Sequence, residues 1–327
     1  MLTAPQPSDS KAILADWLEF RAILVGNASF SELPRAWEEE FGEEEDNNIE
    51  RLNEETPNII FEEIKKRIQF LSESYPFALT DLGITLKEPL TEEQASYLLC
   101  LHLSTVETQL TNCEITNEER RLFQLISTIA SSGYFCANSI WFGFPRPDQS
   151  GFFNAIKNAF EDKIKEGKVH ESPLAGTNSS IKDGEIDIIT YKEMNDNLPG
   201  KLFFYGQVAS GRNYDQKELS KNQIEYIFSL FKIPPSKEYM RGIFIPFCPW
   251  HQVEHKNGIE ALKIRIQQES IKFGLIFSRY RIPFYLYQVL ERKRHNTLSD
   301  KIDGLNEISL LTTWANNFIA HVRQDHT

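Results

Sequence analysis

The 327-residue chain lacks most of the signatures that assign a protein to a compartment or an enzyme class. No apolar run approaches the ~20 residues of a membrane-spanning helix, and the first residues lack the basic start and apolar core of a secretory signal. The phosphate-binding loop GxxxxGK[ST] and the motifs HExxH and GxSxG are all missing. We therefore expect a cytoplasmic protein with no membrane partner that is not itself a P-loop NTPase.

Cysteine is scarce and scattered. The four cysteines are Cys100, Cys113, Cys136 and Cys248, and no two of them form a CxxC pair. Structural zinc sites and disulfide frameworks both depend on closely spaced or patterned cysteines. The spacing argues against both and fits a reducing compartment.

Basic residues are scarce in the first part of the chain. Residues 1–120 hold 25 acidic against 9 basic residues, whereas residues 121–327 hold 22 against 26, which together give the net charge of −12. Binding to nucleic acid requires clustered lysine and arginine that displace counterions from phosphates. Only the second part offers such a surface. The first part is expected to repel DNA and to meet a basic protein surface.

The strongest concentration of acid falls in residues 38–55. Such a run is most simply a solvated loop whose charges repel one another. A DNA-mimicking or partner-docking segment is the alternative, and the composition alone does not choose between them.

Helical patterns dominate residues 1–140. Thr91-Glu-Glu-Gln94 and Thr116-Asn-Glu-Glu119 are capping boxes that precede helices, and residues 58–72 carry apolar side chains at helical spacing. The glycine and prolines of residues 140–150 interrupt this pattern. We therefore predict an acidic helical domain at 1–140 and a second domain at 141–327.

The second domain alternates between helical and extended patterns. The predicted elements are a helix at 151–165, strands at 169–171, 184–188 and 202–207, a helix at 216–231, a strand at 243–247, a helix at 258–271 and a strand at 275–277. Helix, three strands, helix and strand is an α/β order. The remaining residues are predicted to be helical.

Two of these strands carry polar residues that suit a metal site. Asp187 has isoleucine on both sides, so its side chain points away from the face that they bury. Gln207 ends an apolar run, and Gly206 lets the backbone approach closely there. Carboxylate and amide oxygens are ligands for Mg²⁺. Glu185 is a possible second ligand, and Lys217 is placed to orient a water or to stabilise developing charge.

At these residues the chain resembles the restriction-endonuclease-like superfamily, the PD-(D/E)xK nucleases. Gly184-Glu-Ile-Asp187 resembles the metal-binding element of the second core strand. Gly206-Gln-Val-Ala-Ser-Gly211 resembles the end of the third strand in a bacterial defence-associated branch that has glutamine there. The resemblance covers roughly residues 150–285. It implies an N-terminal helical region followed by an αβββαβ core, with Glu161 or Glu166 on the helix before the core as an additional acid.

The resemblance leaves two functions open. It implies Mg²⁺- or Mn²⁺-dependent cleavage of DNA, with Asp187, Gln207 and Lys217 at the reacting centre, as the effector subunit of a bacterial anti-phage defence system. A protein partner, such as an ATPase, would dock on the acidic region. However, Ala209 occupies the position where the family has lysine. The alternative is therefore a catalytically inactive scaffold of the same fold that binds nucleic acid or a partner.

Three arginines are candidates for contact with DNA phosphates. Arg279 and Arg281 follow the strand at 275–277, and Arg212 competes with Lys217 for the role of the displaced lysine. Each has a plainer interpretation as a solvated or ion-paired side chain. Likewise, Asp187 is also consistent with an edge-strand acid, and Lys217 with a surface lysine.

Overall fold

The structure is a computed structural model that describes residues 2–41, 47–144, 146, 148–172, 184–194, 196, 198–248 and 251–324, with the side chains at 40, 41, 47–53, 212 and 251 outside the description. The chain forms two compact units. The first comprises Met1–Glu119, Pro246–Gln268 and Ile308–Thr327, and the second comprises Arg120–Ile245 and Glu269–Glu307. Both units are discontinuous in sequence, which the predicted division at residue 140 did not anticipate.

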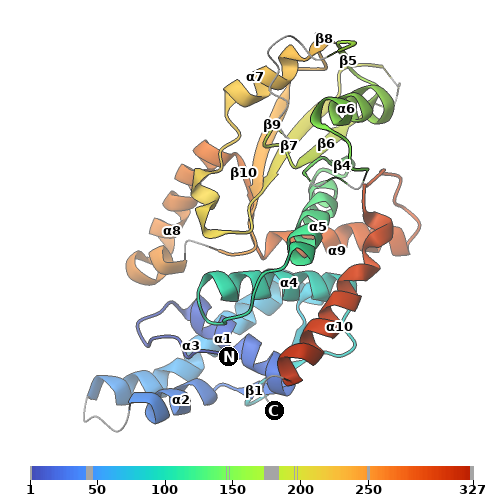
Figure 1. Cartoon of the computed structure of the whole chain (residues 1–327). Helices are drawn as coiled ribbons and strands as arrows, with labels where there is room; N and C mark the ends of the chain where they lie inside the picture. Colours follow the sequence, from blue (N-terminus) through green and yellow to red (C-terminus); the bar gives the residue numbers. More distant parts are fainter. Residues whose placement is uncertain are drawn as a thin grey trace. The chain divides into compact units, whose positions relative to one another are not determined.

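The first unit is largely helical (Figure 1). It contains α1 (Lys11–Val25), α2 (Glu32–Phe41), α3 (Asn47–Leu71), η1 (Ser72–Ser74), α4 (Glu92–Glu107), the start of α5 (Asn117–Phe135), most of α8 (His251–Phe273) and α10 (Ser309–Gln324). The capping box at Thr91 is formed as predicted, and the hydrogen bonds between Thr116 and Glu119 form the second. A small antiparallel sheet of β1 (Asn27–Ser29), β3 (Gly83–Leu86) and β2 (Phe77–Leu79) was not predicted.

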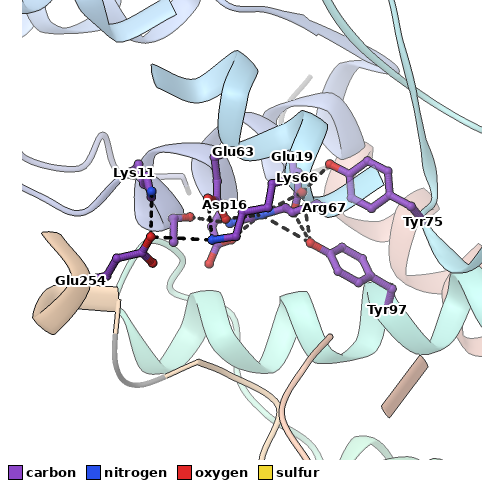
Figure 2. Close-up of polar contacts among 10 residues, drawn as sticks. Lys11, Asp16, Glu19, Glu63, Lys66, Arg67, Tyr75, Tyr97 and Glu254 are labelled. Atoms are coloured by element: carbon purple, nitrogen blue, oxygen red, sulfur yellow. Dashed lines mark hydrogen bonds and ion pairs between the residues drawn. The ribbon is translucent and has the colours of Figure 1, made fainter. Parts of the chain in front are cut away.

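A buried arginine organises the polar interior of the first unit. Figure 2 shows the cluster around Arg67 of α3, with the acids Asp16, Glu19 and Glu63 and the tyrosines Tyr75 and Tyr97. Arg67 Nη1 lies 2.8 Å from Asp16 Oδ1 and 2.9 Å from Glu19 Oε1. Because all these side chains are buried, each charge depends on its partners for solvation. We call this set the Arg67 cluster.

The second unit contains a mixed five-stranded sheet. Its strands are β4 (Asn138–Trp141), β6 (Ile188–Lys192), β7 (Leu202–Val208), β9 (Tyr239–Phe244) and β10 (Leu275–Phe277), in the order β10-β9-β7-β6-β4. The pairs β4–β6 and β6–β7 are antiparallel, and β7–β9 and β9–β10 are parallel. A separate pair joins β5 (Lys168–Val169) to β8 (Phe231–Ile233).

Helices cover both faces of this sheet. The remaining elements are α6 (Phe152–Lys157), its π-helical continuation η2 (Asn158–Ile164), η3 (Arg212–Gln216), α7 (Lys221–Ser229), α9 (Arg281–Arg294) and η4 (Leu305–Glu307). Phe203 and Tyr205 of β7 join the core formed with α6, η2 and α7. Phe204 points to the other face, where its ring lies 4.8 Å from Phe135 of α5. Burial on both faces explains the continuous apolar run of β7.

The predicted α/β class with an N-terminal helical region is confirmed. The strand predicted at 169–171 exists only as β5, which lies outside the five-stranded sheet. The strand that pairs with the outer side of β6 is instead β4. The sequence pattern had assigned the residues of β4 to the helical domain at 1–140 and to the interruption at 140–150. Within the described ranges, no helix has the length and apolar character required to cross a bilayer.

Candidate metal and nucleic-acid site

Asp187 and Gln207 lie near the same end of the antiparallel pair β6–β7. Ile188, the first residue of β6, pairs with Gly206, and Asp187 precedes it. The Asp187 N–H donates to the Gly206 carbonyl over 2.9 Å, which continues the ladder past the start of β6. The structure therefore brings Asp187 and Gln207 to the same end of the sheet, and their convergence on one ion stays a prediction.

The carboxylate of Asp187 is held by the backbone of β7 and given room by a glycine. Its Oδ2 accepts the N–H of Val208 over 2.7 Å. A Cβ placed on Gly143 would lie only 2.6 Å from Oδ1. The Gly143 N–H also donates to the Asp187 carbonyl over 2.8 Å. A side chain at position 143 would therefore occupy the space beside the carboxylate.

Glu185 and Lys217 also contact residues at the end of β7. Gln207 Nε2 lies 3.4 Å from Glu185 Oε2, and Lys217 Nζ lies 3.4 Å from the Val208 carbonyl oxygen. The N–H and C=O of a strand residue point to the same side of the strand, so Lys217 and Asp187 approach Val208 from one side. We call Glu185, Asp187, Gln207 and Lys217 the β7-end cluster.

One residue near this cluster was missed by the sequence analysis. Gln124 of α5 places its Nε2 3.2 Å from the position of a Gly143 Cβ, the same point that Asp187 Oδ1 approaches. Its Oε1 accepts the Trp141 indole N–H over 2.9 Å, which fixes the carboxamide. No sequence signal identifies it, because a glutamine outside the apolar stripe of a helix is indistinguishable from a surface residue.

Glu161 is not brought into the β7-end cluster. Its Oε1 accepts the N–H of Val169 in β5 over 2.8 Å. β5 pairs with β8, which precedes β9, and β9 runs parallel to β7. The β5–β8 pair therefore lies near the start of β7. At about 3.3 Å per residue, the start of β7 is about 20 Å from its end. We therefore leave Glu161 out of the proposed site.

Glu166, on the same side as Glu161, has a different role. Its carboxylate accepts backbone N–H groups of Ser236, Gly200 and Lys201 at 2.8–3.1 Å. Burial raises the pKa of Glu166, but these hydrogen bonds outweigh burial and bring the pKa below its ordinary value. This residue fixes the loops at the start of β7.

The three predicted DNA-contacting arginines differ in their surroundings. Arg279 is 1% exposed, and its guanidinium lies 5.4 Å from the Tyr280 ring centre, so it has no surface to offer a phosphate. Arg281 is exposed, and its Nη1 donates to the Ile276 carbonyl over 2.6 Å. Because β10 runs parallel to β9 and β7, their carboxyl ends lie at the same end of the sheet. Arg281 follows the carboxyl end of β10, and Gln207 lies at that of β7. Arg212 begins η3, and its side chain lies outside the description.

The oxygen atoms of the β7-end cluster suit Mg²⁺ better than zinc. Among the described residues, no three histidine, cysteine or acidic side chains converge as a ligand group. Mg²⁺ keeps several waters and needs only one or two carboxylates together with substrate phosphates. In a site of this kind, Asp187 and Glu185 would supply the carboxylates and Gln207 an amide oxygen. Such a set fits a weakly held ion that substrate completes.

No family model, curated protein or solved structure matches the chain. The resemblance therefore rests on the residues of the chain itself. Partner docking through residues 38–55 also remains a prediction, because residues 42–46 and the side chains of 40–53 lie outside the described residues.

Proposed function

We propose that this chain is a metal-dependent nuclease that cleaves DNA phosphodiester bonds at the β7-end cluster. The observation that carries the proposal is that Asp187 and Lys217 both contact the Val208 backbone at the end of β7, where Glu185 contacts the neighbouring Gln207. The order α5, antiparallel β4-β6-β7, α7 and parallel β9 supports it, since it follows the αβββαβ order that the resemblance implies, with α6, η2 and β5 inserted between β4 and β6 and α5 in place of the expected helix at 151–165.

Each residue of the cluster has a distinct part in this proposal. A bound Mg²⁺ or Mn²⁺ supplies neutralisation of phosphate charge and an activated water. The Val208 N–H holds Oδ2 of Asp187, and the carboxylate supplies the negative charge that the ion requires. Glu185 holds the Gln207 carboxamide, so that its oxygen is oriented. Lys217 orients the attacking water or stabilises charge that develops on the phosphate.

A substitution of Asp187 separates its structural and chemical roles. Asp187→Asn keeps an oxygen that accepts the Val208 N–H but removes the negative charge, so we expect a folded protein. Metal-dependent cleavage of plasmid DNA is expected to fall by at least about 100-fold, the size of effect typical of a lost charged catalytic group. Asp162→Asn, an exposed acid on η2, is the matched control and should cleave like wild type.

The assay includes the partner proteins and both double- and single-stranded substrates, because control by a partner is part of the proposal. Equal activity of wild type and Asp187→Asn across all these conditions contradicts the enzymatic assignment.

A second candidate is the inactive scaffold, and one observation favours it. Ala209 is 1% exposed and donates its N–H to the Phe244 carbonyl over 2.9 Å. The position where the family has lysine is thus part of the packed core. This candidate predicts that DNA binds equally well to wild type and Asp187→Asn, with no cleavage by either.

The biological setting is proposed on the resemblance alone. The chain acts as the effector subunit of an anti-phage system, and an ATPase that binds the acidic region controls when it cleaves. Co-purification with the products of neighbouring genes, with and without residues 38–55 neutralised by Glu→Gln substitutions, tests this. An unchanged complex after neutralisation removes the acidic region from the interface.

A further inference from the structure

A cavity at the β4 edge of the five-stranded sheet lies outside the β7-end cluster. Its volume is about 170 Å³. Its apolar floor consists of Ile140, Phe142, Ala155 and Ala159, all of them buried. Pockets for drug-sized ligands measure about 300–1,000 Å³. The cavity therefore accommodates a single ring system rather than a larger molecule.

The rim of the cavity is polar and electrically balanced. It includes Arg146, Asp148, Asn158, Lys163, Asp303 and Glu307. Lys163 Nζ lies 2.7 Å from Asp303 Oδ2, and Glu307 is paired with Arg121. Burial raises the pKa of the remaining acid, Asp148, but hydrogen bonds from Ser150 and Asn158 and the charge of Arg146 together bring it below its ordinary value. A balanced rim disfavours a phosphate or a metal ion and favours an uncharged ligand with both donors and acceptors.

A planar group already covers the aromatic part of the floor. The Arg146 guanidinium lies 4.8 Å from the centre of the Phe142 ring, and Arg146 is 5% exposed. Because Arg146 covers this face of the Phe142 ring, the guanidinium plane is the stacking surface that remains, and unstacked bases stack on such planes in nucleic-acid-binding proteins. The shape and chemistry of the cavity therefore match a nucleobase, which has apolar faces and a polar edge.

The cavity also adjoins the β7-end cluster. The N–H groups of Phe142 and Gly143 both donate to the Asp187 carbonyl over 2.8 Å. Phe142 thus belongs to the cavity floor and lies next to the residue that makes room for the Asp187 carboxylate. The cavity therefore lies beside the position proposed for the reacting phosphate, within reach of a base that leaves the stack there.

We infer that this cavity binds an unstacked nucleobase of the substrate strand, next to the reacting phosphate. The inference rests on the proposed function for its substrate, a DNA strand. Enzymes that bind an extruded base favour single-stranded or mismatched sites, because unstacking is easiest there. Cleavage is therefore expected to prefer such sites over perfectly paired duplex.

Nucleoside binding tests the cavity without reference to cleavage. Isothermal titration calorimetry of wild type with deoxyadenosine, deoxyguanosine, deoxycytidine and thymidine is expected to show binding of at least one, with a Kd in the millimolar range. Deoxyribose 5-phosphate, which lacks a base, is the comparison ligand and should not bind. Absence of binding by every nucleoside overturns the inference.

Substitutions in the cavity locate the binding. Asn158→Ala removes a rim hydrogen-bonding group and should weaken binding about ten-fold, as expected for one lost hydrogen bond. Asn154→Ala, an exposed position on α6 outside the cavity lining, should leave binding unchanged. Ala159→Leu fills the floor and should abolish binding. If that variant does not fold, Asn158→Ala alone decides the result. Equal binding by Asn158→Ala and wild type contradicts the assignment.

The two proposals fail separately. Nucleoside binding at the cavity without Asp187-dependent cleavage contradicts the nuclease but keeps the base site. Cleavage without nucleoside binding contradicts the base site alone.

Discussion

At the scale of single residues, the Asp187 carboxylate has a structural role in the sheet, and a chemical role is proposed for it. Its Oδ2 closes the β6–β7 ladder by accepting the Val208 N–H, while Oδ1 lies where Gly143 has no side chain. The sequence indicated the chemical role, because an acid between isoleucines at a strand end is a recognisable pattern. The contribution of Gly143 depends on a pairing with β4, which the local pattern did not reveal.

Lys217 is predicted to act in the chemical step. Lys217→Ala is expected to lower kcat by about 100-fold with little change in KM, because a group that stabilises developing charge contributes chiefly in the transition state. Lys221→Ala, an exposed lysine on α7, is the control and should behave like wild type. A raised KM with unchanged kcat would instead make Lys217 a substrate-binding residue.

Glu119 links the stability of the first unit to pH. Burial raises the pKa of Glu119, but the hydrogen bond and charge of His102, together with the hydrogen bonds from Thr116, lower it to about 2. Its stabilising contribution is therefore complete above the ordinary value of 4.5 and is lost as pH falls from there towards about 2. Urea unfolding followed between these pH values should be less pH-dependent in Glu119→Gln than in wild type. Glu118→Gln, at the exposed neighbouring position, should show the same pH dependence as wild type. An equal effect of both substitutions would contradict the assignment of this pH dependence to Glu119.

At the scale of elements, the long and strongly patterned segments were predictable and the short ones were not. The capping boxes and the strands β7 and β10 follow directly from their residues. The four-residue strand β4 gives too brief a pattern to be seen, and only its pairing with β6 defines it. The prediction of Glu161 as a metal ligand was misjudged for the same reason. Long-range strand pairing decides which end of the sheet a helix lies against, and the local sequence does not reveal it.

Helices α1 and α3 are predicted to depend on the Arg67 cluster. Arg67→Met leaves buried carboxylates without their cation, so the free energy of unfolding of the first unit should fall by about 3–5 kcal/mol, as measured for broken buried ion pairs. Lys65→Met, on the exposed side of α3, should change it by less than about 0.5 kcal/mol. Denaturant unfolding monitored by circular dichroism tests both, and a small effect at Arg67 would show that the buried charges are otherwise compensated.

At the scale of the whole molecule, the charge asymmetry of the sequence broadly follows the division of the chain into two units. The β7-end cluster and the cavity both belong to the second unit, which falls almost entirely within the less acidic part of the chain. The predicted boundary missed the return of the chain to the first unit in α8 and α10. Chain connectivity of that kind is set by tertiary packing rather than by local composition.

Arg281, the exposed arginine that follows the carboxyl end of β10, is predicted to contact DNA phosphates. Arg281→Ala should weaken DNA affinity and reduce the slope of log affinity against log salt by about 1, the value for one phosphate contact. Arg294→Ala, in the last turn of α9, is the control. Arg279→Ala should instead destabilise the fold, because Arg279 is buried. An unchanged salt slope for Arg281→Ala would remove that residue from the DNA surface.

The most direct test of the central claim is Mn²⁺ binding in the presence of a non-cleavable oligonucleotide, followed by electron paramagnetic resonance. We predict that wild type binds Mn²⁺ in the ternary complex and that Asp187→Asn, although folded and still able to bind the oligonucleotide, does not. Equal Mn²⁺ binding by the two proteins would contradict a metal site at the end of β7.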